Sequence, residues 1–438
     1  MNILHITSTD LRGAGNAATA FNALLNARGH RSKLVVVFKT KNDPDIIGFI
    51  RPIHRRVKLF LDEIILIFHK IQTYVKVGRT HPDYYFYNLD ERKSNFSAKS
   101  VLRKIDFNPD AIFVHWVSNF VNTAAINELA QLTQAKMYWA MIDNAPITGG
   151  CHYPWTCKGY VTDCSDCPAL LTASKKYIAK RNFELKKANF PAGMQLLTIS
   201  STDKMRAERC NFYLNHKVAV IFQPVNENIF YPVSKTQARK DLNLPQDKKI
   251  IFFAATDISE RRKGFAELQE ALRIFEQNIK ENVQDYLLIT AGKRFSSLQN
   301  SLSCSISTKY LGYLSEQDMV KAFNAATLFV CPTLEDSGPG ILGQAMLCGV
   351  PTVAFATGAA VDLIQTGHTG YLAELGNSAD LAIGIEFVVR LNPDEHTRMS
   401  AECRKSGMSV CSFEAVGERL ENLLSSVDYT IAENKDKI

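Results

Sequence analysis

Short apolar stretches alternate with segments of helical periodicity along most of the chain. In the first half, the apolar stretches predict strands at residues 3–7, 33–38, 111–115, 136–141, 195–200 and 218–222. In the second half, they predict strands at residues 250–255, 286–291, 309–312, 327–331 and 352–356. Strands that alternate with helices are typical of parallel α/β architecture. The pattern therefore predicts two doubly wound, Rossmann-like domains.

The domain boundaries follow from length and from this alternation. A chain of 438 residues is expected to hold two or three domains of about 150 residues each. We place the first domain at residues 1–225 and the second at residues 226–400, joined near 223–232. The tail at 401–438 has helical periodicity between about 402 and 427, and its last residues are charged.

Composition and charge change this picture little. Apolar residues make up 46% of the chain, which is enough for full hydrophobic cores and too many for a disordered protein. The formal net charge is +7, from 51 basic and 44 acidic residues. Such a mild excess suits anionic small molecules or a membrane surface, although an ordinary basic enzyme is the simpler interpretation. No nucleic-acid partner is expected.

The compartment is inferred from the first residues and from the cysteines. Residues 1–7 have the pattern of a strand and lack the basic start and long apolar core of a secretory signal. No run of about 18 apolar residues occurs that would span a bilayer. Most of the ten cysteines are scattered over predicted strands and helices, which fits free thiols in a reducing compartment. We expect a cytoplasmic protein, with the inner face of the membrane as an alternative location.

Loops that follow the predicted strands carry the candidate chemistry, because open parallel sheets bind ligands beyond the carboxyl ends of their strands. The first such loop contains Gly13, Ala14 and Gly15, and its glycines allow close approach of backbone to a ligand. The spacing G-x-G-x-x-A, which ends at Ala18, imitates a dinucleotide fingerprint. However, the second strand ends near Lys39, where that fingerprint requires an acidic residue for ribose. A nicotinamide-dependent oxidoreductase is therefore one alternative, and a flexible turn is another.

The second loop is strongly basic. Arg261, Arg262 and Lys263 follow the strand predicted at 250–255 and precede a helix. Charged hydrogen bonds to phosphate oxygens are stronger than neutral ones, so a basic trio at the end of a strand suits a diphosphate. A solvated basic turn is the alternative interpretation.

The third loop lies in the segment 333–354, which follows a predicted strand and opens a short helix. Ser337 is predicted to cap this helix, and Pro339 suits its first turn. The N-terminus of a helix attracts phosphate through its unpaired N–H groups and its dipole. Glu335 and Asp336 repel phosphate, but they accept hydrogen bonds from hydroxyl groups. A phosphate site beside a polyol site is the outline of a sugar nucleotide.

A family resemblance begins in the same segment. The residues from Ala345 to Pro351 read A-M-L-C-G-V-P, and they follow Asp336 and Gln344. The segment resembles the signature of family 4 retaining glycosyltransferases, in which two spaced glutamates precede A-M-x-C-G-x-P. Asp336 and Gln344 stand where the family has its glutamates. The resemblance implies a GT-B fold, with two Rossmann-like domains that face a central cleft and a C-terminal helix that crosses back to the first domain.

The resemblance also implies roles for single residues. It assigns donor contacts to the loops described above: Gly13, Ala14, Gly15, Glu335, Gly340, Ile341 and Gln344. Asp336 would contact hydroxyls of the transferred sugar, and Gln344 would face the ribose of the nucleotide. Lys263, with Arg262 in place of the usual arginine, would neutralise the leaving diphosphate as its charge develops. In this family, catalysis is expected to need no metal.

A second resemblance concerns the first domain. Residues 143–153 read D-N-A-P-I-T-G-G-C-H-Y, which resembles the H-D-M-x-P-x-T-G-G-C-H-Y of a bacterial polysaccharide subgroup, of the colanic-acid and capsule type. This resemblance places Asp143 and His152 near the acceptor as catalytic candidates, with His115 as a further polar candidate. A buried histidine that is packed and hydrogen-bonded is the alternative.

Four cysteines fall within a cysteine-rich insertion at residues 143–170: Cys151, Cys157, Cys164 and Cys167. The C-x-x-C pair matches half of a zinc site, and the two earlier cysteines would complete it. Zinc here would be structural and would pin a long insertion that has little core of its own. Free thiols are the alternative.

The segment 51–74 combines basic residues with a following apolar helix pattern. This combination resembles an element that lies on a membrane surface, which would serve an enzyme with a lipid-linked acceptor. A core helix with a polar start is the alternative.

Taken with the resemblance, the chain is expected to be a retaining glycosyltransferase of bacterial surface polysaccharide synthesis. It would transfer a sugar from a nucleotide-sugar donor to a hydroxyl of a glycan or lipid-linked glycan. A sugar-binding or partner protein without catalysis is the second alternative, because Gln344 lacks the charge of the usual glutamate.

Overall fold

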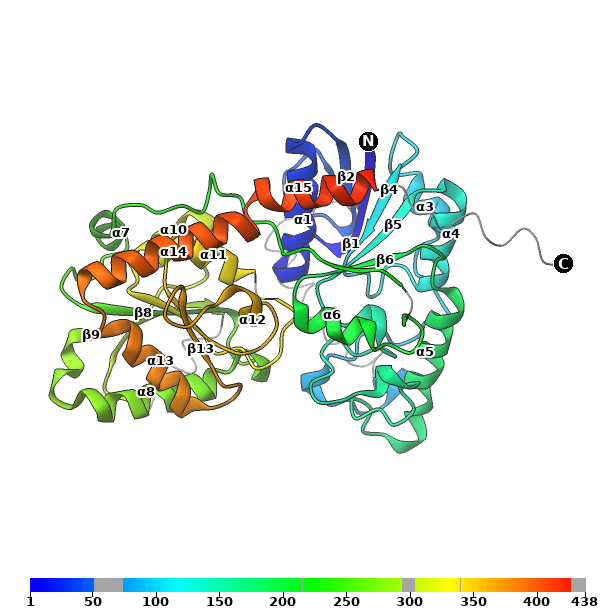
Figure 1. Ribbon diagram of the computed structural model, residues 1–438. Helices are drawn as coiled ribbons and strands as arrows, with labels where there is room; N and C mark the ends of the chain where they lie inside the picture. Colours follow the sequence, from blue (N-terminus) through cyan, green and yellow to red (C-terminus); the bar gives the residue numbers. More distant parts are fainter. Residues whose placement is uncertain (51–73, 215, 294–303, 339, 427–438) are drawn as a thin grey trace. The chain divides into compact units, whose positions relative to one another are not determined.

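The computed structural model describes residues 1–50, 74–214, 216–293, 304–338 and 340–426 (Figure 1). The chain divides into two compact units. The first comprises Met1–Ile199, Asp203–Ile221 and Gly417–Ile438, and the second comprises Ser200–Thr202 and Phe222–Val416. None of the helices within the described ranges is both long and apolar enough to cross a membrane.

The first sheet has seven strands in the order β3-β2-β1-β4-β5-β6-β7, all paired in parallel. Its strands are β1 (Asn2–Thr9), β2 (Arg31–Phe38), β3 (Ile46–Ile50), β4 (Ala111–Val114), β5 (Lys136–Met141), β6 (Gln195–Thr198) and β7 (Val218–Val220). The helices of this part of the chain are α1 (Arg12–Ala27), α3 (Ala98–Leu102), α4 (Thr123–Thr133), α5 (Tyr177–Asn189) and α6 (Ser201–Glu208).

The second sheet has six parallel strands in the order β10-β9-β8-β11-β12-β13. Its strands are β8 (Lys249–Asp257), β9 (Tyr286–Lys293), β10 (Ser307–Tyr310), β11 (Leu328–Cys331), β12 (Thr352–Phe355) and β13 (Gly370–Ala373). The helices that follow the join are α7 (Lys235–Asp241), α8 (Phe265–Ile279), α10 (Glu316–Ala325), α11 (Ile341–Leu347), α12 (Ala360–Leu363), α13 (Ser378–Val389), α14 (Pro393–Cys411) and α15 (Phe413–Ser425).

The interior strands of both sheets are buried and apolar on both faces, as is typical of parallel sheets. Every residue of β4 and β11 is buried. In the second unit, α8 and α13 cover one face of the sheet, whereas α10, α11 and α14 lie on the other (Figure 1). An aromatic cluster of Phe252, Phe323 and Phe329 fills the core there, with ring centroids 5.4 to 5.6 Å apart.

The prediction of two doubly wound domains is confirmed, and every predicted strand is present within a few residues of its expected bounds. Two strands were not predicted. β3 has only one buried residue, Ile46, and Gly48 interrupts its apolar run, so that it lacks the pattern of an interior strand. β13 begins at Gly370 and only its end residues are buried, so it too lacks the pattern of an interior strand.

The helix after β11 begins later than predicted. Its N-cap is Gly340, and no side chain caps it. The prediction that Ser337 caps this helix is therefore wrong: Ser337 lies three residues before the N-cap and is completely buried in the preceding loop. Pro339 lies outside the described residues.

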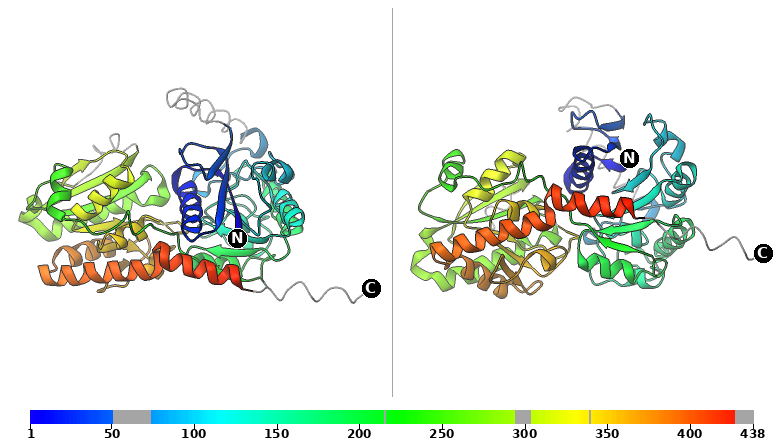
Figure 2. Two further views of the ribbon diagram at one scale, coloured as in Figure 1. Left: turned by 90° about the horizontal axis from the view of Figure 1, so that it is seen from above. Right: turned by 45° about the horizontal axis from the view of Figure 1, so that its top comes forward.

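The C-terminal segment forms two helices rather than the single helix predicted between 402 and 427. They meet at Ser412, whose extended backbone (ψ 156°) separates α14 from α15. From Gly417 onward the chain belongs to the first unit. There, the Arg28 guanidinium donates two hydrogen bonds to the Glu421 carboxylate, at 2.7 and 2.8 Å. Two views of this region, with α15 in red and α1 in blue, are given in Figure 2.

Candidate functional site

The topological switch point of the second sheet lies between β8 and β11. The chain leaves β8 toward β9 on one side, and it later returns to place β11 on the other side. Ligands of open α/β sheets bind beyond the carboxyl ends of the strands at such a point. The loops that follow β8, β11 and β12 meet here.

Close backbone contacts hold these three loops together. A Cβ atom added to Gly264, which has φ +68°, would lie 1.6 Å from the Pro332 carbonyl oxygen, so only glycine allows this approach. The Leu334 N–H donates a 2.8 Å hydrogen bond to the Arg262 carbonyl oxygen. In the loop after β12, a Cβ atom on Gly358 would lie 2.4 Å from the Asp336 carbonyl oxygen. The positions of the side chains in these loops are therefore fixed by backbone packing.

The side chains of these loops form a compact charged cluster. Asp336 Oδ2 accepts from Arg262 Nη1 at 2.5 Å and from Lys263 Nζ at 2.7 Å. Arg262 also pairs with Glu260 at 2.7 Å. Burial by itself raises the pKa of Asp336, which is 8% exposed, but Lys263 and Arg262 outweigh this effect and lower its pKa from 3.8 to about 2. Asp336 is therefore ionised at any physiological pH.

This cluster is internally compensated. The charges of Arg262 and Lys263 are balanced by those of Asp336 and Glu260, at 2.5 to 2.7 Å. A diphosphate that binds to the two cations would therefore compete with these carboxylates. Arg261 points elsewhere and pairs with Glu267 on a more exposed surface. The structure thus brings together Arg262, Lys263 and Asp336 of the predicted site, and it separates Arg261 from them.

The other donor-side residues lie at the start of α11. Gly340 is the N-cap and Ile341 is the first helical residue, while Gln344 lies in the first turn and is half-buried. A Cβ atom on Gly340 would lie 2.4 Å from the amide oxygen of Gln223, a residue that the sequence did not single out. Glu335 is buried in the loop before the helix.

The first unit contains a separate buried polar network. Asp143 Oδ2 lies 2.7 Å from His152 Nδ1, and His152 Nε2 lies 3.1 Å from Ser118 Oγ. The Ser118 hydroxyl donates to Asn88 Oδ1 at 2.6 Å, and the indole nitrogen of Trp116 lies 3.1 Å from His152 Nδ1. The structure therefore brings the predicted pair Asp143 and His152 together, and it adds three residues that sequence reasoning missed.

His115 lies apart from this network in the core of the first sheet. One of its ring nitrogens lies 2.9 Å from a ring nitrogen of His5, and both side chains are buried. Burial lowers the pKa of His115 to about 3, and burial together with His115 lowers the pKa of His5 well below its usual value. His115 is thus a neutral, packed core residue, which is the simpler of its two interpretations.

The loop after β1 is shaped by a buried acid that was not predicted as a site residue. Asp10 is completely buried, and it accepts hydrogen bonds from Thr40 N, Thr40 Oγ1 and Lys41 N at 2.7 to 2.8 Å. A Cβ atom on Gly15 would lie 2.4 Å from the Asp10 carbonyl carbon, so this glycine serves the packing of its own loop. Gly13 and Ala14 precede it at the start of α1, and a Cβ atom on Gly13 would meet nothing within 4 Å.

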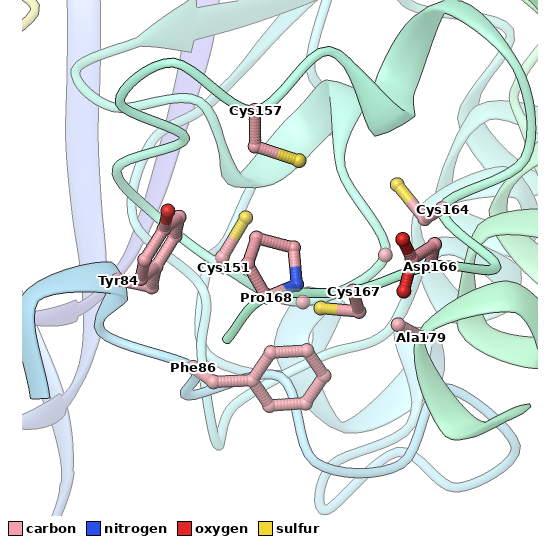
Figure 3. Close-up of a pocket in the computed structure, with 11 residues that line it drawn as sticks. Tyr84, Phe86, Cys151, Cys157, Cys164, Asp166, Cys167, Pro168 and Ala179 are labelled. Atoms are coloured by element: carbon pink, nitrogen blue, oxygen red, sulfur yellow. The ribbon is translucent and has the colours of Figure 1, made fainter. Parts of the chain in front are cut away.

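The cysteines of the insertion surround one small pocket in the first unit (Figure 3). All four thiols predicted as zinc ligands line it, and all are free: Cys151, Cys157, Cys164 and Cys167. Burial raises the pKa of Cys164 to about 12 and that of Cys167 to about 11. Across the described residues, no group of three or more His, Cys, Asp or Glu side chains lies, as placed, so that it could hold a metal ion. The membrane element predicted at 51–74 falls, apart from its last residue, outside the described residues.

One family model matches part of the second half of the chain. Residues 234–406 match the family model described as "Glycosyl transferases group 1". This range contains the cluster of Arg262, Lys263 and Asp336 and the whole of α11.

The curated relatives that match in sequence include two with different activities in their names. One is the N-acetyl-alpha-D-glucosaminyl L-malate synthase of Bacillus anthracis, which is 26% identical over 217 residues, or 49% of this chain and 55% of the relative. The other is the D-inositol 3-phosphate glycosyltransferase of a Nocardioides species, which is 23% identical over 210 residues, or 44% of this chain and 46% of the relative. The chain therefore spans about half the length of the curated relatives that it matches.

Solved structures match over nearly the whole chain. The sucrose-phosphate synthase of Thermosynechococcus elongatus superimposes with a TM-score of 0.63 at 16% identity, covering 97% of this chain and 98% of that one. HepE of Anabaena in complex with UDP-glucose superimposes with a TM-score of 0.62 at 13% identity, covering 98% and 100%.

These matches define the class of the fold. The architecture is GT-B, built from two Rossmann-like units that each have a parallel sheet. Within it, residues 234–406 relate the chain to the group 1 glycosyltransferases.

Proposed function

We propose that this protein is a glycosyltransferase that takes a sugar from a nucleoside-diphosphate sugar and transfers it to a hydroxyl group. One observation carries the proposal: Lys263, Arg262 and Asp336 form a charged cluster at the switch point of the second sheet, inside the range that matches the group 1 glycosyltransferase model. The match of HepE in complex with UDP-glucose supports the same class of donor.

The cluster supplies the positive charge that the reaction needs. When the bond between the anomeric carbon and the diphosphate breaks, negative charge develops on the leaving diphosphate, and preorganised cations stabilise it. Lys263 and Arg262 take this role, and Asp336 moves from the cations to hydroxyls of the sugar as the diphosphate replaces it. Gln344 binds the ribose. Backbone N–H groups at Gly340 and Ile341, which lack intrahelical partners at a helix start, bind phosphate.

In the proposed reaction, the acceptor oxygen forms the new bond to the anomeric carbon. The proton of the acceptor hydroxyl passes to the leaving phosphate, on the same face as the attack, so the configuration is retained. No residue is assigned as a nucleophile, and no metal takes part. Asp143 and His152 are proposed to position the acceptor in the first unit. There, His152 is held between Asp143 and Ser118.

The acceptor is proposed to be a glycan or a lipid-linked glycan of bacterial surface polysaccharide synthesis. The sequence of residues 143–153 supports this subgroup through its T-G-G-C-H-Y motif. The basic and apolar sequence of residues 51–74 supports peripheral contact with a membrane. Flotation with anionic liposomes should carry the protein, and added salt should weaken that binding. Indifference to liposomes at low salt would remove the membrane role.

Ligand binding tests the donor class directly. In a thermal-shift panel of UDP, GDP, ADP, CMP and NAD(P), one nucleoside diphosphate is expected to stabilise the fold. A ligand at 100 times its Kd adds about 2.7 kcal/mol to the free energy of unfolding. Stabilisation by NAD(P) alone would instead support the oxidoreductase alternative.

Turnover tests the role of the cations. The variant Lys263→Ala is expected to retain its fold and to lose at least about a hundredfold in turnover, the scale seen when one group that stabilises developing charge is removed. Near-normal turnover would contradict the role of Lys263. If the natural protein binds donor without turnover while Gln344→Glu gains turnover, the chain is a sugar-binding protein that lacks catalysis.

A further inference from the structure

Four cysteines from separate turns of the 143–170 insertion surround one cavity of about 10 Å³, which is the size of a single water molecule (Figure 3). A Cβ atom placed on Gly159 would lie 3.4 Å from Cys157 Sγ and 3.5 Å from Cys164 Sγ, so both sulfur atoms lie around one point. The remaining lining is largely apolar, with Phe86 and Pro168 among its residues.

Backbone N–H groups are directed at three of the sulfur atoms. The Gly159 N–H donates to Cys157 Sγ at 3.3 Å, and Cys167 Sγ accepts from Ala169 and Leu170. Cys164 Sγ accepts from Gly149. Such hydrogen bonds would strengthen when a metal converts the thiols to thiolates, because an N–H group is attracted more strongly to a charged acceptor.

The second observation is a buried lysine that binds the backbone of the same insertion. The Lys186 side chain is 1% exposed, and its ammonium group donates to the carbonyl oxygens of Ala145 and Thr148, at 2.5 and 2.9 Å. Both acceptors are neutral, and a buried charge is costly without an opposite charge nearby. Lys186 does not line the pocket, but the two carbonyl oxygens that hold its ammonium group belong to the same insertion as the four cysteines. Lys186 therefore brings a buried positive charge to the segment that carries the four thiols.

We propose that Cys151, Cys157, Cys164 and Cys167 bind one structural zinc ion in this pocket. Four thiols that bind Zn²⁺ release four protons and leave a tetrathiolate complex of charge −2. Lys186 offsets part of that charge. Four sulfur ligands fill the tetrahedral preference of zinc and leave no open position, which distinguishes a structural site from a catalytic one.

Zinc binding requires the sulfur atoms to close in. A zinc–sulfur bond is about 2.3 Å long, so the four sulfurs must come together more tightly than neutral thiols do. Rotation of the side chains supplies this movement, since all four already line the same cavity. Cys164 has a left-handed backbone (φ +57°), which a non-glycine residue adopts at a cost of about 1 kcal/mol. The metal offsets this strain by fixing the turn between Cys157 and Cys167.

The zinc site has a structural role that is separate from the proposed transferase chemistry. Its role is to hold a segment whose regular structure is limited to short 3-10 turns, such as Ala145–Ile147 and Gly159–Val161. Cys151 directly precedes His152, so the metal would fix one end of the segment that presents this histidine to Asp143. The zinc proposal therefore concerns how the insertion is stabilised, and it does not depend on which sugar is transferred.

Metal analysis of the full chain, purified without chelator and without a polyhistidine tag, tests the proposal. One zinc per chain is expected, together with four thiols that stay unreactive toward an aromatic disulfide until a mercurial releases the metal. Cobalt(II) substituted for zinc should show the intense thiolate-to-cobalt absorption of a tetrahedral sulfur site. This measurement needs no variant, and the absence of the thiolate-to-cobalt absorption would overturn the proposal.

The matched variants are Cys157→Ser and Cys210→Ser. Cys157 is the most exposed of the four, so its replacement disturbs the core least, whereas Cys210 is a buried thiol of the same unit outside the pocket. Cys157→Ser should lose zinc at least about tenfold more readily to a chelator, and Cys210→Ser should retain it. Bound iron, disulfides detected by mass, or a chain without metal and with four reactive thiols would each overturn the assignment.

Discussion

Replacing Asp336 by Asn should tighten the binding of a diphosphate even though it removes a residue of the proposed site. In the free protein, Asp336 holds both Lys263 and Arg262, at 2.7 and 2.5 Å. An incoming diphosphate needs the same two cations. The carboxylate therefore competes with the ligand, and its neutralisation should release the cations.

The pKa of Asp336 gives the size of this competition. A decrease from 3.8 to about 2 corresponds to about 2 kcal/mol in favour of the charged carboxylate, after the opposing effect of burial. If the diphosphate must overcome most of this interaction, Asp336→Asn should bind it about tenfold more tightly, or about 1.4 kcal/mol. Turnover should fall in the same variant, because the amide accepts hydrogen bonds from sugar hydroxyls less strongly than a carboxylate does.

Titration calorimetry with UDP and with inorganic pyrophosphate would measure the effect, since pyrophosphate carries only the charged part of the ligand. Glu267→Gln is the matched control. It removes the partner of Arg261, which is a neighbouring cation that does not point at the cluster. The control should change the affinity less than twofold. Unchanged or weaker pyrophosphate binding by a folded Asp336→Asn variant would refute the reasoning.

Three further predictions concern stability. Because the pKa of Asp336 is lower in the folded protein, its contribution of about 2 kcal/mol to the free energy of unfolding is present above about pH 4 and lost as the pH falls toward 2. The free energies of unfolding of the natural protein and of Asp336→Asn, measured with urea, should therefore converge as the pH falls over that range. Because burial lowers the pKa values of His5 and His115, acid should destabilise the protein below about pH 6.5 by up to about 1.4 kcal/mol per pH unit for each histidine, and His115→Gln should reduce this slope in the same assay. Asp10→Ala should lower the free energy of unfolding by about 2 kcal/mol, because the N–H groups of Thr40 and Lys41 would lose their acceptor; equal urea midpoints would contradict it.

The fold was predictable because its strands are short apolar runs separated by helical segments. β5 was predicted with its observed bounds, since Lys136–Met141 is buried almost throughout. β3 and β13 lie at sheet edges and are only partly buried, so the hydrophobic pattern that marks interior strands is missing from them.

The candidate site was predictable as a set of loops but not as a set of contacts. Arg262 and Lys263 were found from their position after a strand, whereas their pairing with Asp336 joins residues more than 70 positions apart. That contact depends on the backbone packing of Gly264 against Pro332, for which one sequence carries no signal.

The buried charges show where a usable signal was missed. The buried face of α5 runs through Ile178, Ala179, Asn182 and Phe183, and its next position is Lys186. Residues at this spacing share one face of a helix, so the lysine could have been placed in the interior from the sequence alone. Asp10 had a weaker signal, because its partners Thr40 and Lys41 lie 30 and 31 positions further along the chain.

The return of the chain to the first unit sets the order in which the protein can be completed during synthesis. Residues 222–416 form nearly all of the second unit, and the ribosome makes all of them before Glu421 is available to Arg28. The Lys136 ammonium also gains its partner only when this segment has been made, since it donates to the carbonyl oxygen of Leu424. The first unit is thus the last to be finished, although its sequence starts first, and a fragment that ends near residue 221 would lack its own closing helix.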